Sequence, residues 1–128
     1  IQDLGLSNHI HLLGERSDIP RLTAALDINT LASAYGEAFP LVIGEAMSSC
    51  VPCVVTDVGD SAWIVGNTGR VVPPRNSEAL ARAWKELILM GNEGRKMLGK
   101  AARSRIIDSF SINSVVAQYE SLYELILA

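Results

Sequence analysis

Residues 27–56, which read DINTLASAYGEAFPLVIGEAMSSCVPCVVT, carry the pattern that decides the fold. An apolar run at 27–32 predicts one strand, and the β-branched run at 53–56 predicts another. Between them a glycine-containing loop leads into a helix predicted over residues 40–49. Pro40 can open that helix because its missing N–H would have had no helical partner. A strand, a helix and a strand joined by short loops predict a parallel sheet covered by helices.

The same alternation continues on both sides of this segment. Upstream, the short apolar run at 9–13 predicts a strand, and Ser17 is the expected N-cap of a helix that ends near Leu26. Downstream, residues 70–72 predict a further strand, stopped by two prolines. The chain is then predicted to close with three helices, which begin at Ser77, at Glu93 and at Ser111 or Asn113. The fold class is therefore α/β.

Length and composition exclude several classes of protein. With 128 residues, 48% hydrophobic and 20% charged, the chain is one domain or part of one and not a disordered tail. No stretch approaches the roughly 20 apolar residues that span a bilayer. Two cysteines cannot form a secreted disulfide framework, and a net charge of −3 argues against a nucleic-acid binder. Because the chain begins at Ile1 and not at Met, we expect a piece of a longer protein. Its expected location is the cytoplasm.

The charge is unevenly distributed along the chain. Residues 1–64 hold two basic and eight acidic side chains, whereas residues 65–128 hold nine basic and six acidic ones. The first half therefore has few cations with which to bind an anion. Backbone dipoles are expected to supply most of the attraction for any anion that binds there.

The loop and helix at residues 33–47 form the expected site. Ligands of open α/β sheets lie at the carboxyl ends of strands, against helix N-termini. There the first-turn amides are unpaired and the helix dipole favours an anion. Phe39, Leu41 and Val42 can each offer an amide, whereas Pro40 cannot.

Two glutamates flank this expected anion site, Glu37 in the loop and Glu45 in the helix. A carboxylate beside a phosphate is repulsive unless it faces hydroxyl groups, from which carboxylates accept hydrogen bonds. The arrangement suits a ligand with phosphates in the middle and hydroxyls at both ends, as in a nucleotide sugar. From these residues alone, a solvated loop acid and a helix acid favoured by the dipole remain an open alternative.

Four stretches together carry a family resemblance. They are the motif Glu37-x7-Glu45, the run VPCVVTDVG at 51–59, the run TGRVVPP at 68–74 and the run HLLGER at 11–16. With them the chain resembles, over essentially its whole length, the retaining GT-B glycosyltransferases of family 4. The resemblance implies a Rossmann-like parallel sheet, the C-terminal half of a GT-B C-terminal domain without its first two strands. Residues 1–128 would be part of the nucleotide-sugar (donor) domain.

The resemblance also implies an activity and its residues. Such an enzyme transfers a sugar from a nucleotide sugar to an acceptor with retention of anomeric configuration, without a metal ion or other cofactor. Glu37 would bind the hydroxyls of the transferred sugar as the catalytic-site acid, and Glu45 the ribose hydroxyls. The sugar and diphosphate would contact the backbone of Phe39, Pro40, Leu41 and Val42, and the base would lie near Gly14 and Arg16.

The family's acceptor is bound mainly by a separate N-terminal domain, which this chain lacks. It also lacks two strands and a glycine-rich turn whose Arg and Lys grip the diphosphate in the family. We therefore expect no turnover by this chain alone, and self-association through an exposed sheet edge. Two alternatives remain open: another GT-B enzyme such as a nucleotide-sugar epimerase, and a non-catalytic α/β binding module.

Some features depart from the family pattern or lie outside the site. Cys50 stands where a glycine usually ends the motif helix, and a left-handed cap there would cost roughly 1 kcal/mol. Asp60 and Trp63 stand near positions often held by glycine and an acid. The Cys50-x-x-Cys53 spacing is interpreted as buried packing and not as a redox site. The basic side chains of the helix at 93–107 are expected to form a solvated face, with contact to anionic lipid at the inner membrane face as the alternative. His9 and His11 are expected to be ordinary, partly exposed strand residues. The apolar stripe Val115, Tyr119, Leu122 and Ile126 is expected to pack in the core or at a domain interface.

Overall fold

The protein, described by a computed structural model over residues 1–127, is built around a three-stranded parallel sheet. Strand β2 (Cys53–Thr56) lies in the middle, between β1 (Asn29–Leu31) and β3 (Arg70–Val72). Thr30 is paired with Val54, and Val55 with Val71. The predicted α/β class and Rossmann-like parallel sheet are confirmed. Because the strands are parallel, their carboxyl ends meet at one edge of the sheet.

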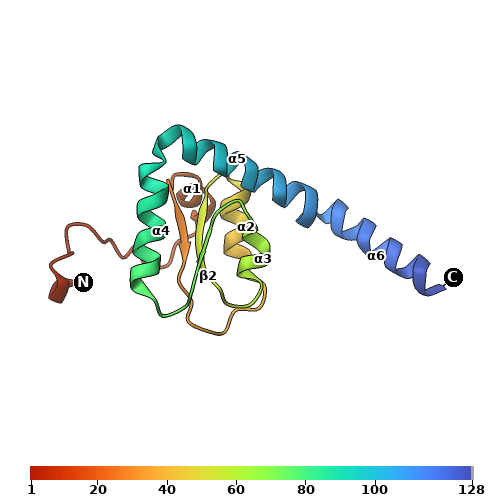
Figure 1. Ribbon diagram of the computed structural model, residues 1–128, viewed down its shortest axis with the longest axis horizontal. Helices are drawn as coiled ribbons and strands as arrows, with labels where there is room; N and C mark the ends of the chain where they lie inside the picture. The colour runs from red at the N-terminus through yellow and green to blue at the C-terminus, as the bar shows by residue number, and fades with distance from the viewer. Residues whose placement is uncertain (128) are drawn as a thin grey trace.

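Helices cover both faces of this sheet (Figure 1). They are α1 (Ile19–Ala24), α2 (Leu41–Ser48), α3 (Ser61–Val65), α4 (Ser77–Leu89), α5 (Gly91–Phe110) and α6 (Ile112–Leu127), after a short 3₁₀ turn η1 (Gln2–Leu4). Helix α3 was not predicted, because its five residues are too few to show a helical period. The N-caps of α1 and α4 are Asp18 and Asn76, each one residue away from the predicted Ser17 and Ser77.

The core consists of two layers separated by β2. On one face, Cys53 and Val55 pack in a cluster with buried residues of α2, α3 and α5. On the other, Val54 packs with buried residues of α4. Val54 and Val55 are both fully buried, and burial of such a side chain contributes about 1.5–3 kcal/mol. A strand buried on both faces is a continuous apolar run, which explains why CVVT shows no alternation.

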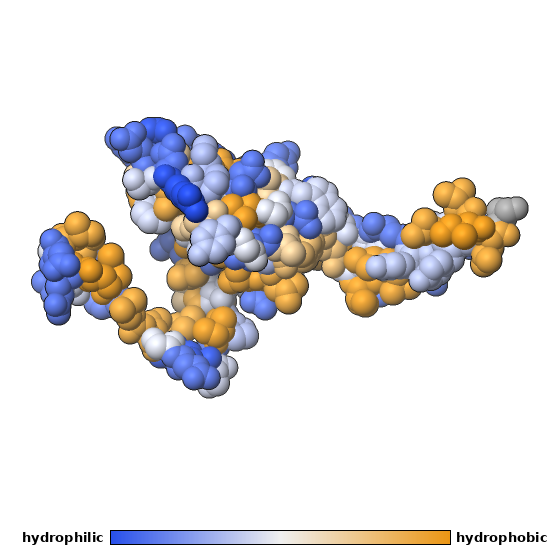
Figure 2. Space-filling view, turned by 90° about the horizontal axis from the view of Figure 1, so that it is seen from below, coloured by the Kyte–Doolittle hydropathy of each residue, from blue (hydrophilic) through white to orange (hydrophobic). Residues whose placement is uncertain are grey.

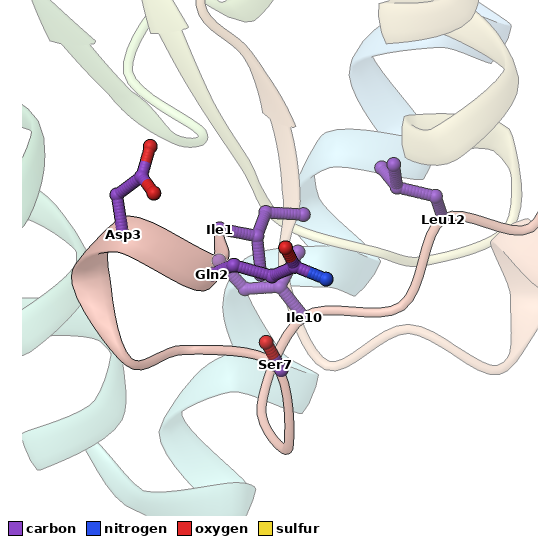
Figure 3. A pocket seen from close by; sticks show the side chains of 6 residues that line it. All are labelled: Ile1, Gln2, Asp3, Ser7, Ile10 and Leu12. Atoms are coloured by element: carbon purple, nitrogen blue, oxygen red, sulfur yellow. The ribbon is translucent and has the colours of Figure 1, made fainter.

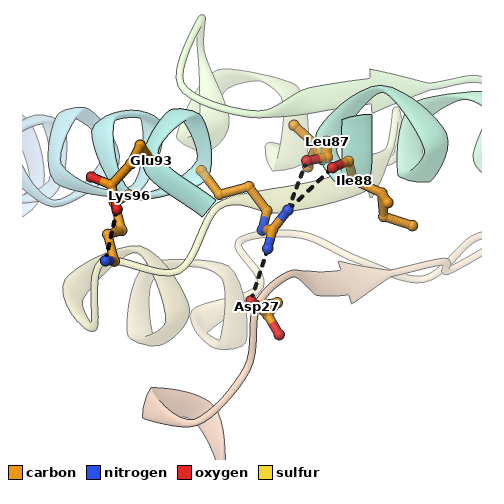
Figure 4. A network of polar contacts seen from close by, with 6 residues as sticks. Asp27, Leu87, Ile88, Glu93 and Lys96 are labelled. Carbon is orange, nitrogen blue, oxygen red and sulfur yellow. Dashed lines mark hydrogen bonds and ion pairs between the residues drawn. The ribbon is translucent and has the colours of Figure 1, made fainter. Parts of the chain in front are cut away.

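Helix α5 is tied to three other helices by arginine side chains. Arg95 donates hydrogen bonds to the carbonyls of Leu87 and Ile88 at the end of α4, and to Asp27 at 3.1 Å (Figure 4). Arg103 donates to the carbonyl of Ser48 at the end of α2. These contacts place a cation at the negative end of a helix dipole.

Arg105 makes the third such contact, at the end of α3. The predicted solvated basic face of α5 is therefore wrong for Arg95 and Arg105, which are partly buried, whereas Arg103 is exposed and still bonds a helix carbonyl. Their guanidinium groups cap other helices, which a reading of α5 alone could not reveal. The alternative interpretation was that the basic side chains of α5 contact anionic lipid. Most of these charges are instead bonded to other helices.

The predicted strand at residues 9–13 is not formed. The segment runs without regular structure, and Leu12 and Leu13 are 84% and 56% exposed. A strand needs a neighbour to pair with its backbone, and among residues 1–127 the three strands pair only with one another. His9 and His11 are exposed but do not lie on a strand. Figure 3 shows the hollow of about 510 Å³ that this segment forms with η1.

Helix α6 projects away from the sheet (Figure 1), and none of its described residues is buried. The predicted cap is present, since Ser111 Oγ accepts a hydrogen bond from the Ser114 amide at 3.2 Å. The prediction that the apolar stripe of this helix packs in the core is wrong, because Tyr119 is 56% and Ile126 69% exposed. Figure 2 shows apolar surface on both projecting ends of the molecule. Within residues 1–127 no helix combines the length and apolar character needed to cross a membrane.

Candidate functional site

The loop that follows β1 is fixed by side chains at the carboxyl edge of the sheet. Thr56, the last residue of β2, donates from Oγ1 to the carbonyl of Ser33 at 2.7 Å. Ser33 in turn donates from Oγ to Glu37 Oε1 at 2.6 Å. Glu37 is half-buried, and no other described side chain bonds its carboxylate. This carboxylate is therefore oriented by the fold and keeps acceptor capacity for a ligand.

Helix α2 begins directly after this loop, with Pro40 as its N-cap. Pro40 is buried and has no N–H, and no side chain in the described part of the chain caps the helix. The Ile43 amide bonds the Pro40 carbonyl at 3.2 Å, which leaves the amides of Leu41 and Val42 without a backbone or side-chain partner among the described residues. Leu41 is 68% exposed. The start of α2 is therefore an open, uncapped helix N-terminus of the kind that binds anions.

Glu45 lies on the exposed surface of α2 between two hollows. One, of about 240 Å³, is lined by Phe39, Leu41, Glu45 and residues of α3 and α5. The other, of about 300 Å³, lies between α1 and α2, where Glu45 meets Ile19 and Pro20. The first hollow thus joins three of the predicted site residues, while Glu37 lines neither of them.

The α1 lining of the second hollow was missed by sequence reasoning. Ile19, Pro20 and Thr23 lie more than twenty residues before Glu45 and carry no motif. Their contact with α2 is tertiary, and a helix of six residues gives little periodic signal. A pocket with apolar walls and one carboxylate can take a flat ring with hydroxyl groups beside it.

The turn after β2 packs tightly against the loop that carries Glu37. Gly59 has a φ of 56°, and a Cβ at this position would clash with the carbonyl oxygens of Glu37 and Ala38. The Asp60 amide donates to the Ala38 carbonyl at 2.8 Å. Because Asp60 uses its backbone here, its side chain can differ from the glycine often found in the family without loss of this contact.

Gly14 and Arg16, the predicted neighbours of the base, lie on the exposed N-terminal segment. Gly14 has a φ of 68°, which suits glycine. Arg16 forms an ion pair with Asp18 at 2.7 Å, and this hydrogen bond lowers the pKa of the Asp18 carboxyl. Neither residue lines the two hollows at Glu45, so the described structure does not bring them to the rest of the site.

The two cysteines are free. Cys50 adopts the expected left-handed conformation, with a φ of 60°. Cys53 is buried, and burial raises the pKa of its thiol to about 11, partly offset by the hydrogen bond from Asn29. A thiol that stays protonated is a poor nucleophile, in agreement with the packing role. Among residues 1–127 no three His, Cys, Asp or Glu side chains group together as metal ligands.

Comparison with known proteins gives a family match. The sequence model of the family described as "Glycosyl transferases group 1" matches residues 1–105. The exopolysaccharide phosphotransferase SCO2592 of Streptomyces coelicolor is 37% identical over 127 residues, which cover 96% of this chain and 13% of that protein.

Two solved structures are similar in fold and sequence. A glycosyltransferase from Rickettsia africae is 32% identical with a TM-score of 0.87, over 99% of this chain and 34% of that one. Anabaena Alr3699/HepE, solved in complex with UDP-glucose, is 30% identical with a TM-score of 0.83, over 97% of this chain and 35% of that one. The chain thus spans about a third of the length of these solved proteins.

Proposed function

Because the chain belongs to the glycosyl transferases of group 1, we propose that it carries part of the donor site of an enzyme that transfers a sugar from a nucleotide sugar to an acceptor. The observation that carries this proposal is the start of α2, where two free amides lie between Glu37 and Glu45. A diphosphate at these amides would gain the helix dipole without needing a cation from the acidic first half of the chain.

Each end of the donor then has a carboxylate to meet its hydroxyl groups. Glu37, oriented by Ser33, binds hydroxyls of the transferred sugar, and Glu45 binds the ribose diol. The hollow between α1 and α2 takes the nucleoside, since it shares Glu45 and has apolar walls at Ile19 and Pro20. Gly14 and Arg16 remain proposed neighbours of the base.

The proposal includes a reaction that retains anomeric configuration and requires no metal ion. The negative charge of the diphosphate is then stabilised by the amides of Leu41 and Val42 and by cations from outside residues 1–128. The acceptor binds to a separate N-terminal domain, and the enzyme acts in the cytoplasm. The UDP-glucose complex of the 30% identical Alr3699/HepE supports a nucleotide-sugar donor.

A titration of the ¹⁵N-labelled chain with UDP and UDP-glucose tests the site. We expect amide shifts at residues 36–46, with weak, millimolar-range binding because few cations are present. Glu45→Gln should weaken binding about tenfold, the scale of one lost charge-assisted hydrogen bond. Glu120→Gln, an exposed substitution on α6, is the matched control and should bind like the native chain. Shifts confined to other residues would exclude the proposed site.

A further inference from the structure

Arg105 fixes α3 on α5. Its Nε donates to the Ile64 carbonyl at 2.9 Å and its Nη2 to the Trp63 carbonyl at 2.5 Å. The last carbonyls of a helix lack partners within the helix, so a guanidinium there satisfies them. Gly66, the C-cap of α3, leaves room for this contact, because a Cβ there would lie 2.8 Å from Arg105 Cζ. Arg105 therefore adds a polar link between α5 and the end of α3, beside the core packing of Ile64 and Val65.

An aromatic cluster links the same two helices to the start of α2. Trp63 of α3 packs edge-on against Phe39 and Phe110, with ring centroids 6.1 and 4.9 Å apart, and Phe39 lies 5.9 Å from Phe110. The Arg105 guanidinium lies 5.6 Å from the Phe110 ring centroid, within reach of a cation–π contact. Phe39 directly precedes Pro40, the N-cap of α2.

The loop that carries Glu37 is held at its start by the hydrogen bonds of Thr56 and Ser33, and its end depends on further contacts. Gly36 has a φ of 85° and its position is open, so the loop has a flexible point just before Glu37. Within residues 1–127 no side chain caps α2. The contacts that hold the end of the loop are the Asp60 amide on the Ala38 carbonyl and the ring of Phe39. The Asp60 amide and the Trp63 ring belong to the start and the body of α3, whose end is bonded by Arg105, and Phe110 of α5 adds a second ring contact to Phe39.

We propose that Arg105 and Trp63 are positioning residues of the donor site. They act through α3 and Phe39 to hold residues 37–39 where Glu37 and the first amides of α2 meet a nucleotide sugar. This role rests on the proposed function of that site. Neither residue lines the hollows at Glu45. Trp63 stands near a position where the family often has an acid, so this arrangement of Arg105 and Trp63, called the clamp below, is a property of this chain's own residues.

Amide hydrogen exchange tests the clamp without a ligand. In Arg105→Gln and Trp63→Leu, we expect the Asp60 amide to exchange at least about tenfold faster relative to the amides of β2, because local opening exposes it. Arg82→Gln is the matched control, since Arg82 is exposed on α4 and, among the described residues, pairs only with Glu78 at 3.8 Å. It should leave Asp60 protected.

Binding of UDP tests the role in the donor site. Arg105→Gln should weaken UDP binding several-fold, whereas Arg82→Gln should not. Trp63→Phe keeps a ring in the cluster and should bind UDP more tightly than Trp63→Leu does. A loss of overall stability alone does not predict this difference in affinity. In Trp84→Phe, Trp63 is the remaining tryptophan of the two in the chain, and its emission should change when UDP is added.

The outcomes are distinguishable. Native protection of Asp60 in Arg105→Gln would overturn the clamp, as would lost protection with unchanged UDP affinity. A native chain whose residues 36–46 do not respond to UDP contradicts the proposed function, and the donor-site role of Arg105 fails with it. Faster exchange at Asp60 together with weaker binding, rescued by Trp63→Phe, is the result we expect.

Discussion

At Cys50 the chain ends α2 in a left-handed conformation, and α5 crosses this turn at Gly99. The left-handed turn was predicted from sequence, because a glycine usually stands at this position in the family. Its partner was not predicted, because a glycine inside a helix gives no sign of what it faces. A Cβ on Gly99 would overlap the Cys50 carbonyl, so the two helices approach as closely as their backbones allow.

Two glycines of α5 should respond unequally to the same substitution. Gly99→Ala should destabilise the fold by about 1–3 kcal/mol, because the new methyl group meets backbone that cannot move aside. Gly94→Ala would place its methyl group against Met90 Cγ, which a rotation of the Met90 side chain can relieve, and should cost less than about 1 kcal/mol. Urea unfolding of both variants measures the difference. Equal effects on stability would show that α5 does not pack on Cys50 as described.

At the scale of elements, β2 carries a titratable group in the core. Burial raises the pKa of Cys53 from its ordinary value of 9.0 to about 11, so the folded chain holds the thiol proton more tightly than the unfolded chain does. The contribution to stability is complete below pH 9 and is lost as the pH rises toward 11, where both states release the proton.

Comparison with Cys53→Ala isolates this contribution from other groups that titrate at high pH. We expect the stability difference between the two proteins to shrink by about 1–3 kcal/mol between pH 8 and pH 11. Unfolding in urea across this pH range measures it. A constant difference would mean that Cys53 is accessible to solvent in the native state.

Local patterns predicted the elements that depend on local chemistry. The runs around β2 and β3 and the proline before α2 were enough to place these elements within a residue or two. The strand at 9–13 was wrong because pairing depends on a distant neighbour and not on the apolar run itself. The arginine caps of α5 and the α1 wall beside Glu45 were missed for the same reason, since both are contacts between segments far apart in the sequence.

The candidate site shows the same division between local and distant information. Glu37, Leu41, Val42 and Glu45 lie on one loop and the helix that follows it, so their spacing alone places them together. Trp63 and Arg105 belong to the site only through tertiary packing.

At the scale of the whole molecule, the chain presents several unpaired surfaces. One edge of β1 has no neighbouring strand among residues 1–127, and both projecting ends carry apolar side chains. We expect concentration-dependent association in light scattering. The double variant Leu122→Lys and Ile126→Lys should reduce it if α6 contributes, while association through β1 would remain. A monodisperse monomer at high concentration would contradict this prediction.

The central claim is that the start of α2 binds the diphosphate of a nucleotide sugar between two glutamates. A crystal structure of the chain with UDP-glucose tests it most directly. We predict phosphate oxygens within hydrogen-bond distance of the Leu41 and Val42 amides, with the ribose at Glu45 and the sugar at Glu37. A ligand bound with its diphosphate away from this helix end, or with either carboxylate turned away from its hydroxyls, would contradict the account.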